Sequence, residues 1–419
     1  MVGYGTMPIS CVTVKHYGCT PTTLMWCKRI IKMNSIERKN ARYERRKTKR
    51  QTNRDRIIED IGTAEEVFNY HNMFKYGLDC CKGVMWKQAP QTFKRHLFSR
   101  TAVNRKKVLN GYKPKPLVHF VLSERGKTRP IDAPHIDDRQ IQKVLTKKVL
   151  LPLYQSRMIY DNGASLKGKG LIFAQSQLDK VLRRHIKKYG YNGYVIIADF
   201  KSFFPNADRS VIKGKHKEIK DDRLRTILDT VTDSFKGDVG LPLGVEPSQL
   251  EMIALPSPLD NYMCCQLGLK GFGHYMDDYH IFVPPDQSPK DVLQVFIQKA
   301  GDLGIKVSTG KTQIIRIGKP FKYCKRKRIY KAGKIISLGD RRSKQRLRRK
   351  IKAFANNKEM LYEDIYTSIN SSLAYFDKTN NHGTVLRLRR LFYSLFGFSC
   401  EDIREYRRRD NELHLPQQV

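Results

Sequence analysis

The spacing of apolar residues divides the chain into stretches of helical and of strand character. Residues 64–110 have mainly helical spacing, whereas residues 117–122 form a short apolar run typical of a strand. A turn-like Glu-Arg-Gly sequence follows at residues 124–126, and residues 127–131 are again strand-like. The pattern therefore predicts a group of helices followed by a β-hairpin.

Polar residues mark where further elements are expected to begin and end. Asp137 or Asp138 is suited to cap a helix, since its side-chain oxygen can accept a hydrogen bond from a free backbone N–H group. The apolar face of this helix consists of Ile141, Val144, Leu145 and Val149. The apolar run at residues 194–198 predicts a strand that ends at Asp199, and Asp208 is expected to cap the helix after it.

A second hairpin is expected around Asp277 and Asp278. These residues lie between strand-like runs, with Tyr275 and Met276 on one side and residues 279–283 on the other. Adjacent carboxylates at a turn can leave the sheet and reach a cation, but Asp is also common in ordinary polar turns. The tetrapeptide alone leaves both interpretations open.

The end of the chain is basic and helical. Beyond residue 341, the side chains of Leu347, Ile351 and Phe354 share one helical face. The other faces carry Arg346, Arg348, Arg349 and Lys350. Together with the predicted strands and hairpins, these helices indicate an α+β fold.

The first sixty residues differ from the rest. The composition changes sharply at Met33, which predicts that translation starts there and that residues 1–32 are a leader from an over-extended reading frame. Residues 33–63 then form a basic N-terminal arm. Its densest part, residues 37–56, is either a helix or a disordered segment, and it either binds RNA or is a solvated leader.

The charge of the chain indicates an anionic partner. Lys and Arg number 80 against 40 for Asp and Glu, which gives a formal net charge of +40. Such a charge repels itself unless a polyanion neutralises it, and each neutralised nucleic-acid phosphate releases a counterion. A membrane-surface protein is the alternative, but the chain lacks a dominant amphipathic basic helix and an apolar run long enough to cross a bilayer.

Cysteine usage and the start of the chain favour a reducing, cytoplasmic setting. The nine cysteines are odd in number and contain no CxxC spacing, which argues against a disulfide framework and a zinc ribbon. The start also lacks the basic segment, apolar stretch and cleavage site of a secretory signal.

The aspartates at the two strand ends have a shared chemical reason to converge. Asp199 ends an apolar strand, where a carboxylate needs a counter-charge, and Asp277 on a neighbouring hairpin would only add repulsion. Two Mg²⁺ ions resolve this conflict, with Mn²⁺ as the alternative ion, because hard oxygen ligands hold them. In a nucleotidyl transfer such ions clamp the attacking 3′-oxygen and the leaving pyrophosphate.

The order of these motifs resembles that of prokaryotic reverse transcriptases, over residues 82–398. The resemblance implies that Asp199, Asp277 and Asp278 are catalytic and bind metal. It also implies that the backbone carbonyl of Phe200 is offered to a metal ion.

Other positions resemble nucleotide contacts of the same family. Phe204 falls on the steric gate that excludes a ribose 2′-hydroxyl, with core packing as the alternative. Lys127 and Arg129 resemble the basic pair that grips the incoming triphosphate, and Arg129 is the better candidate in a chain so rich in surface lysines. Residues 307–311 resemble the segment whose lysine, here Lys311, approaches the leaving pyrophosphate and can protonate it.

A glycine-rich segment at residues 240–249 resembles the family motif that lies under the nascent base pair. Gly244 and Gln249 are accordingly assigned to substrate binding, since Gly244 lets the backbone approach a nucleotide closely. Ser248 is expected to cap the following helix. Glu246 departs from the family pattern, in which an amide is commoner.

The resemblance implies a right-hand polymerase with fingers, palm and thumb. We assign the fingers to residues 64–190, the palm to residues 191–330 and a basic helical thumb to residues 331–419. The implied partners are an RNA template, a DNA primer and dNTPs.

Two segments of the sequence indicate which group of reverse transcriptases the chain resembles most. The Leu-Gly and Ser-Gln pairs in residues 243–249, and residues 162–170, look most like enzymes of diversity-generating retroelements and of phage defence. No ribonuclease H domain, His-Asn-His endonuclease segment or integrase-like region is evident in the sequence. We therefore expect an accessory protein or a structured RNA as a further partner.

Three other functions share part of this sequence pattern. An RNA-dependent RNA polymerase would usually have Gly-Asp-Asp at the hairpin and a small residue at the gate, so Tyr275, Met276 and Phe204 argue against it. A catalytically silent, maturase-like RNA-binding protein has no need of three aspartates. A template-independent or protein-primed DNA polymerase of a defence system stays open, because the same metal site would serve it.

Overall fold

The computed structural model describes residues 34–124, 127–357 and 362–400. The chain divides into two compact units, Met1–Asp60 and Ile61–Val419. The leader predicted at residues 1–32 lies outside the described residues. None of the described helices is both long enough and apolar enough to cross a membrane.

Helix α2 (Ser35–Ile61) makes up most of what is described of the first unit. Its start is stabilised by a reciprocal cap: the Glu37 N–H donates to the Asn34 side chain at 2.8 Å, and the Asn34 N–H donates to the Glu37 carboxylate at 3.0 Å. The helical alternative for residues 37–56 is therefore correct, and the disordered alternative is wrong.

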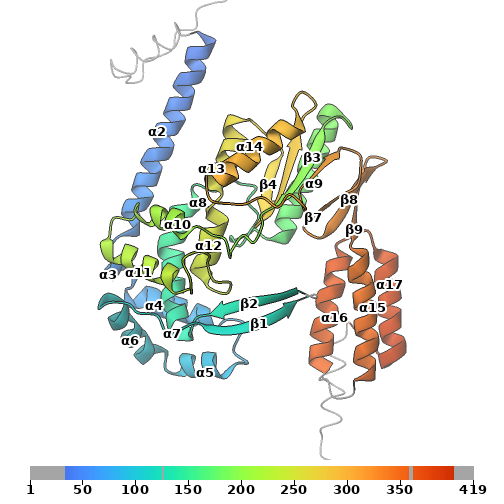
Figure 1. The fold of residues 1–419 in the computed structure, drawn as a ribbon. Coiled ribbons are helices and arrows are strands. Elements are labelled where there is room, and N and C mark those ends of the chain that lie inside the picture. The colour runs from blue at the N-terminus through green and yellow to red at the C-terminus, as the bar shows by residue number, and fades with distance from the viewer. Residues whose placement is uncertain (1–33, 125–126, 358–361, 401–419) are drawn as a thin grey trace, which may run out of the picture. The chain divides into compact units, whose positions relative to one another are not determined.

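The second unit begins with helices that surround a hairpin. These are α3 (Ala64–Val67), α4 (Tyr70–Cys81), α5 (Gln88–Arg95), α6 (Leu97–Leu109) and, after the hairpin, α7 (Ile136–Leu145). The hairpin joins β1 (Val118–Glu124) to β2 (Lys127–Ala133) in antiparallel register (Figure 1). The helices predicted for residues 64–110 and the hairpin after them are confirmed.

The predicted cap of helix α7 is wrong. The helix starts at Ile136 with His135 as its N-cap residue, and no side chain caps it. Asp137 and Asp138 lie inside the first turn, where they are held by side chains around helix α6 instead. Their partners are Arg100 at 3.1 Å from Asp137, and Lys107 and the Tyr112 hydroxyl at 3.2 and 3.1 Å from Asp138.

The predicted apolar face of this helix is confirmed, since Ile141, Val144, Leu145 and Val149 are all fully buried. Val149 lies in a π-helical turn, η1 (Thr146–Leu150), that continues α7 into α8 (Leu151–Gln155).

A four-stranded antiparallel sheet forms the centre of the second unit. Its strands are ordered β4 (Phe272–Tyr275), β5 (Asp278–Val283), β3 (Tyr194–Asp199) and β6 (Gln313–Arg316). The strand predicted to end at Asp199 and the hairpin around Asp277 and Asp278 are confirmed.

Alternation along the strands gives this sheet two apolar faces. Ile196, Ala198, Tyr279 and Ile281 belong to one core, together with Phe296 of helix α14 (Pro289–Gly301). Val195, Ile197 and Phe282 belong to the other core, with Leu178 and Val181 of helix α9 (Leu171–Tyr189). Both faces therefore pack against helices, which leaves the strand ends as the places where carboxylates of this sheet can reach a ligand.

Short helices connect β3 to β4. They are α10 (Arg209–His216), α11 (Asp222–Asp233), α12 (Glu246–Ala254), α13 (Ser257–Asn261) and the π-helical turn η2 (Tyr262–Gln266). The cap at Asp208 is confirmed, because its carboxylate accepts from the Ser210 N–H at 2.8 Å. The cap at Ser248 is wrong: α12 starts two residues earlier, at Glu246, and Ser248 is buried inside it.

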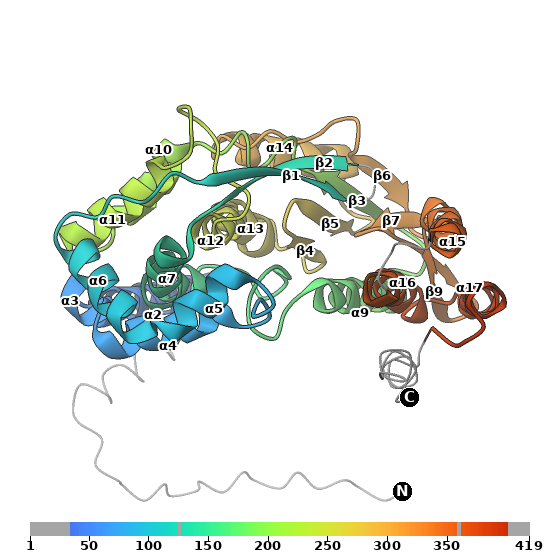
Figure 2. The ribbon, with the colours of Figure 1, turned by 90° about the horizontal axis from the view of Figure 1, so that it is seen from below.

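The last part of the unit is a small sheet followed by three helices. The sheet has the order β7 (Phe321–Tyr323), β8 (Arg326–Lys331), β9 (Lys334–Gly339), and the helices are α15 (Arg341–Asn356), α16 (Tyr362–Asp377) and α17 (His382–Phe396). The three helices pack on one another (Figure 2). As predicted, Leu347, Ile351 and Phe354 of α15 face their common core. Helices and antiparallel sheets together confirm the α+β class.

Candidate active site

The central sheet brings the three predicted aspartates together at one edge. Asp199 ends β3, and Asp278 begins β5 as its direct partner in the antiparallel register. Asp277 lies in the turn before β5, and its carbonyl accepts a hydrogen bond from the Phe200 N–H at 3.3 Å. Backbone pairing alone therefore fixes the spacing of these three residues.

The turn that carries Asp277 is tight and strained. Tyr275 and Asp278 face each other as the last pair of β4 and β5, so that only Met276 and Asp277 form the turn. Met276 has φ of +55°, a left-handed conformation that non-glycine residues rarely adopt. Such a conformation persists only where the surroundings impose it.

A buried hydrogen-bond network beneath the turn provides those surroundings. Nδ1 of His274 lies 2.9 Å from the Met276 carbonyl, and its Nε2 lies 3.1 Å from a carboxylate oxygen of Asp260. The Tyr279 hydroxyl donates to the other oxygen of Asp260 at 3.2 Å, and its ring stacks on His274. His274 and Asp260 are both fully buried.

Sequence reasoning missed this network. The available signal was a histidine at an inward position of a buried strand, which needs a polar partner. Its partner, Asp260, lies 14 residues earlier on helix α13 and has no local motif.

We expect the network to affect catalysis through the turn. Asp260→Asn removes the carboxylate that holds His274, so the Met276 carbonyl should lose its fixed position. Because the same turn carries Asp277, kcat should fall roughly 10–100-fold, with little change in KM for dNTP. Tyr279→Phe, which removes one donor to Asp260 but leaves the His274 contact, should have a smaller effect. Steady-state kinetics beside thermal melts test this, and an activity loss that only follows unfolding would contradict it.

A segment after helix α14 places Lys311 at the carboxylates. The Ser308 N–H donates to the Asp199 carbonyl at 2.7 Å, and the Lys201 N–H donates to the Lys306 carbonyl at 2.8 Å. This pairing aligns the segment with the residues after β3. The Lys311 ammonium group then reaches an Asp199 carboxylate oxygen at 2.7 Å, and this contact raises the pKa of Lys311.

Crowding of negative charge dominates the electrostatics of the site. Burial, and then the charges of Asp277 and Asp199, raise the pKa of Asp278 to about 6. Burial and the charge of Asp199 likewise raise the pKa of Asp277, while the cations of Lys311 and Arg129 lower it. The site therefore holds more carboxylate charge than its own side chains neutralise.

Phe204 lies in the turn after β3, next to this edge. Its side chain is half-buried, whereas its neighbour Phe203 is buried in the core. The Phe204 carbonyl accepts a hydrogen bond from the Leu241 N–H at 2.9 Å. The predicted gate residue is thus tied to the predicted motif at residues 240–249.

Comparison with protein families identifies this arrangement. The family described as reverse transcriptase (RNA-dependent DNA polymerase) matches residues 113–327, slightly more than half of the chain. The chain belongs to the reverse transcriptase family. The enzyme is therefore an RNA-directed DNA polymerase, a nucleotidyltransferase that uses an RNA template, a primer and nucleotides, and the family fold is a palm with fingers and thumb. No curated protein matches the chain.

Gly244 of this reverse transcriptase contacts the β1–β2 hairpin. It is exposed with φ of +117°, and a Cβ atom added to it would lie 2.8 Å from the Asp132 carbonyl oxygen. The neighbouring Leu243 carbonyl accepts from the Asp132 N–H at 2.8 Å. The close backbone approach expected here is therefore made to strand β2.

Two further residues of the motif at residues 240–249 lie on helix α12. Gln249 is half-buried, with its backbone N–H bonded to the Val245 carbonyl at 3.3 Å. Glu246, the departure from the family pattern, forms ion pairs with Lys143 at 2.9 Å and Lys147 at 3.1 Å. Its carboxylate therefore joins α12 to α7 and η1, which gives this departure a structural reason.

The hairpin of the reverse transcriptase supplies a cation to the site. Arg129 is exposed on β2, opposite Leu122, and its charge acts on Asp277. Lys127 begins the same strand, but its side chain lies outside what the structure describes. Of the predicted basic pair, only Arg129 can thus be related to the carboxylates.

The donor set suits Mg²⁺ chemically. Three carboxylates meet at one sheet edge, and burial, followed by mutual repulsion, raises the pKa values of Asp277 and Asp278, as expected where a divalent cation is needed. Over the described residues, however, no group of three His, Cys, Asp or Glu side chains is already gathered around a metal position. Instead, Lys311 makes an ion pair with Asp199, so metal binding requires a rearrangement of these side chains.

Removing one carboxylate should stabilise the metal-free enzyme. The pKa of Asp278 is about 6 in the folded state, against an ordinary value of 3.8. The folded protein therefore binds the Asp278 proton more tightly than the unfolded chain does. This favours folding fully below pH 3.8, and the benefit is lost as the pH rises through about 6. Asp278→Asn should therefore increase the free energy of unfolding by about 1–3 kcal/mol at pH 8 in EDTA. Thermal melts at pH 8 and pH 5 measure this, and the gain should shrink at pH 5.

The matched control is Asp302→Asn, since Asp302 is an exposed residue paired only with Lys299 in the described interactions. It should leave the melting temperature nearly unchanged at both pH values. A loss of stability in Asp278→Asn at pH 8, or an equal gain at both pH values, would contradict the electrostatic account.

Proposed function

We propose that this enzyme adds dNTPs to the 3′ end of a primer along an RNA template by two-metal nucleotidyl transfer. The observation that supports this most is the meeting of Asp199, Asp277 and Asp278 at one sheet edge, within the region that matches the family. The repulsion between them gives a physical reason for bound cations.

The parts of the chain take the roles of a right hand in this proposal. Residues 64–190, with α3–α9 and the β1–β2 hairpin, serve as fingers. Residues 191–330, with the central sheet, serve as palm, and residues 331–419, with helices α15 and α17 as the basic elements, hold the duplex by its phosphates. The exposed cations of helix α2, in residues 33–63, supply additional nucleic-acid contacts.

Asp199, Asp277 and the Phe200 carbonyl would hold two Mg²⁺ ions, or Mn²⁺ ions, with Asp278 tuning the site from close by. When bound, such ions lower the pKa of the attacking hydroxyl and stabilise the charge that develops on the phosphate. Asp199 and Asp277 would orient such ions, because the register of β3 with β5 fixes the backbone of Asp199 and the Asp277 carbonyl accepts a hydrogen bond from the Phe200 N–H at 3.3 Å.

In this proposal, basic and aromatic side chains bind and orient the incoming nucleotide. Lys311 is proposed to donate a proton to the leaving pyrophosphate, and its contact with Asp199 at 2.7 Å supports a position close to the carboxylates. Arg129 and Lys127 neutralise the triphosphate, and Gly244 and Gln249 lie under the new base pair. Phe204 closes the space that a ribose 2′-hydroxyl would need.

Primer extension with the full chain tests this function. We expect DNA product on a poly(rA)/oligo(dT) hybrid with Mg²⁺ and dTTP, and none from the Asp277→Asn, Asp278→Asn double variant. Product that forms without template would indicate template-independent synthesis. DNA linked to the protein would indicate protein priming, and the absence of product from both proteins would favour a silent binding protein or a missing RNA or protein partner.

A further inference from the structure

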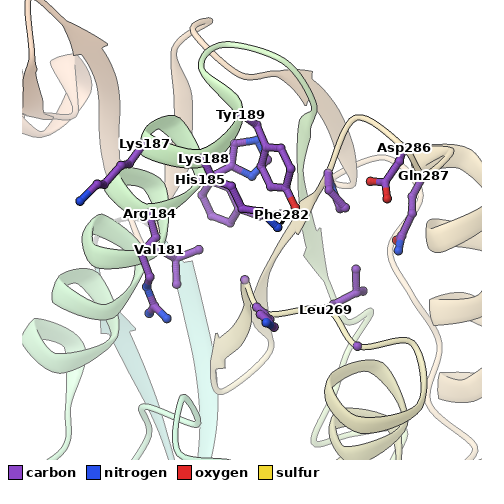
Figure 3. Close-up of a pocket in the computed structure, with 14 residues that line it drawn as sticks. Val181, Arg184, His185, Lys187, Lys188, Tyr189, Leu269, Phe282, Asp286 and Gln287 are labelled. Atoms are coloured by element: carbon purple, nitrogen blue, oxygen red, sulfur yellow. Dashed lines mark hydrogen bonds between the residues drawn. The ribbon is translucent and has the colours of Figure 1, made fainter. Parts of the chain in front are cut away.

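A cavity of about 600 Å³ lies on the face of the central sheet that helix α9 covers. It is bounded by the last turns of α9, by residues 268–271 before β4, and by residues 284–287 after β5 (Figure 3). We call it the α9 pocket. Its volume is in the range of sites that hold small organic ligands or single nucleotides.

The α9 pocket is separate from the carboxylates. Phe282, which lines it, is bonded through its N–H to the Gly271 carbonyl at 2.9 Å, near the end of β5 opposite to Asp278. With a rise of about 3.3 Å per residue, the four steps along β5 from Asp278 to Phe282 separate the two places by roughly 13 Å. A ligand in the pocket therefore has no contact with the reacting atoms.

The walls of the pocket are apolar and aromatic. They include Val181, Leu269 and Phe282, with the rings of His185 and Tyr189 beside them (Figure 3). The His185 and Tyr189 ring centroids are 5.1 Å apart, and His185 is buried with Nε2 at 2.7 Å from the Asn192 carbonyl. Burial lowers the pKa of His185, so its ring is neutral and belongs to the wall.

The rim of the pocket is strongly basic. Four exposed cations, Arg184, Lys187, Lys188 and Lys270, line it against a single carboxylate, Asp286. The Lys188 ammonium lies 4.5 Å from the centre of the Tyr189 ring and donates to its hydroxyl at 2.6 Å. Aromatic wall and cationic rim are therefore in direct contact.

The basic surface continues beyond the pocket along the same helix. Lys180 and Arg183 are also exposed on α9: Lys180 lies about one turn before the rim residue Arg184, and Arg183 is its direct neighbour in the sequence. A small anion would need only the rim. A chain of phosphates, by contrast, would use both the rim and this extension.

We propose that the α9 pocket binds one nucleotide of a single-stranded nucleic acid, with the base against the aromatic wall and the neighbouring phosphates on the α9 cations. Aromatic contacts to a base combined with cations along the backbone are the usual means by which proteins hold single strands. A free phosphate would make no favourable contact with the apolar walls. An acidic peptide would bring backbone amides that those walls cannot bond.

This site lets the enzyme hold a strand while template and primer occupy the catalytic edge. It goes beyond the proposed polymerisation, because it requires no chemistry and no dNTP. A single strand anchored roughly 13 Å from the carboxylates is either an unpaired part of the template RNA or a separate RNA.

The test measures binding of a ten-residue cytidine oligoribonucleotide with one 4-thiouridine to the full chain saturated with unlabelled poly(rA)/oligo(dT). We expect ultraviolet cross-links in residues 181–189, 268–271 or 282–287. Tyr189→Ala should weaken this second binding event about 5–100-fold, and Tyr189→Phe should not. An arm with the deoxycytidine oligonucleotide distinguishes RNA from DNA, and tighter binding of either strand is consistent with the site.

Charge variants separate the pocket from the general basicity of the chain. Arg184→Glu with Lys187→Glu should reduce the salt dependence of binding by about one unit of slope for each lost phosphate contact. The charge-matched pair Lys217→Glu with Lys236→Glu, both at exposed positions outside the pocket, should have a much smaller effect. Primer extension on the hybrid should be unchanged in Tyr189→Ala, so failure of this proposal is distinct from failure of the proposed function.

Three results would overturn the proposal. One is cross-linking only outside the three pocket segments. Another is an equal loss of binding in the pocket pair and the matched pair. The last is competition by inorganic phosphate or by poly-glutamate at concentrations as low as those of the oligonucleotide, which would make the pocket a general anion or acidic-peptide site.

Discussion

Asp277→Asn is expected to reduce DNA synthesis by about 10³-fold or more, the largest effect of any single substitution in this enzyme. The amide keeps the size and turn geometry of the side chain but removes one negative charge from the site. The backbone contact between the Asp277 carbonyl and the Phe200 N–H is unaffected by the change. The loss should therefore be in chemistry and not in folding.

Binding of template and primer should change little in the same variant. Affinity for nucleic acid comes mainly from phosphate contacts with cations, and the chain carries 80 Lys and Arg residues that the substitution leaves in place. Removing one acidic charge should, if anything, slightly strengthen binding.

The measurement pairs single-turnover primer extension with fluorescence binding of the same RNA/DNA hybrid. Asp302→Asn serves as the control for replacing an aspartate elsewhere on the palm, and it should retain both activities. Synthesis by Asp277→Asn within about tenfold of the parent enzyme would contradict the assigned role, since no group in the proposal can replace that carboxylate.

The strands and hairpins of the palm could be predicted because each has a local cause. Residues 194–198 are apolar on both faces, and the structure covers both faces of β3. The turn before Asp278 follows from two adjacent aspartates between apolar runs. Those local signals were sufficient to bring Asp199 and Asp278 to the same edge, because antiparallel pairing of neighbouring strands leaves few alternatives.

The helix caps were less predictable, because a carboxylate near a helix start can find a tertiary partner instead. Asp137 and Asp138 bind Arg100 and Lys107, residues that lie about 30 or more positions away in the sequence. Helix α12 starts at Glu246 for a similar reason: the Glu246 carboxylate forms ion pairs with Lys143 of α7 and Lys147 of η1.

The support beneath the catalytic turn could not be predicted for a related reason. Asp260 and His274 show no spacing that signals a pair, and only the packing of α13 under β4 and β5 brings them together. The family motif predicted that Lys311 approaches the leaving pyrophosphate, but it did not predict the contact of Lys311 with Asp199. Its geometry depends on backbone pairing of Ser308 with Asp199, which no pattern in the sequence indicates.

Phe204→Ala should relax the choice of sugar by roughly 10–100-fold, measured as the ratio of kcat/KM for dGTP to that for GTP on a poly(rC)/oligo(dG) hybrid. The reason is steric: an aromatic side chain at this position fills the space beside C2′ of an incoming nucleotide, and alanine opens it. Because the Phe204 backbone is held by the Leu241 N–H, the loop should keep its path in the variant.

The same substitution tests whether Phe204 acts in the core instead. Phe204 is only half-buried and packs at the margin of the core to which Phe203 fully belongs. Phe203→Leu is therefore the matched control: it should lower the melting temperature yet retain discrimination against GTP. Phe204→Tyr should retain discrimination and stability together. An unchanged dGTP-to-GTP ratio in Phe204→Ala, with a fall in stability like that of Phe203→Leu, would assign Phe204 to packing and leave sugar selection to another residue.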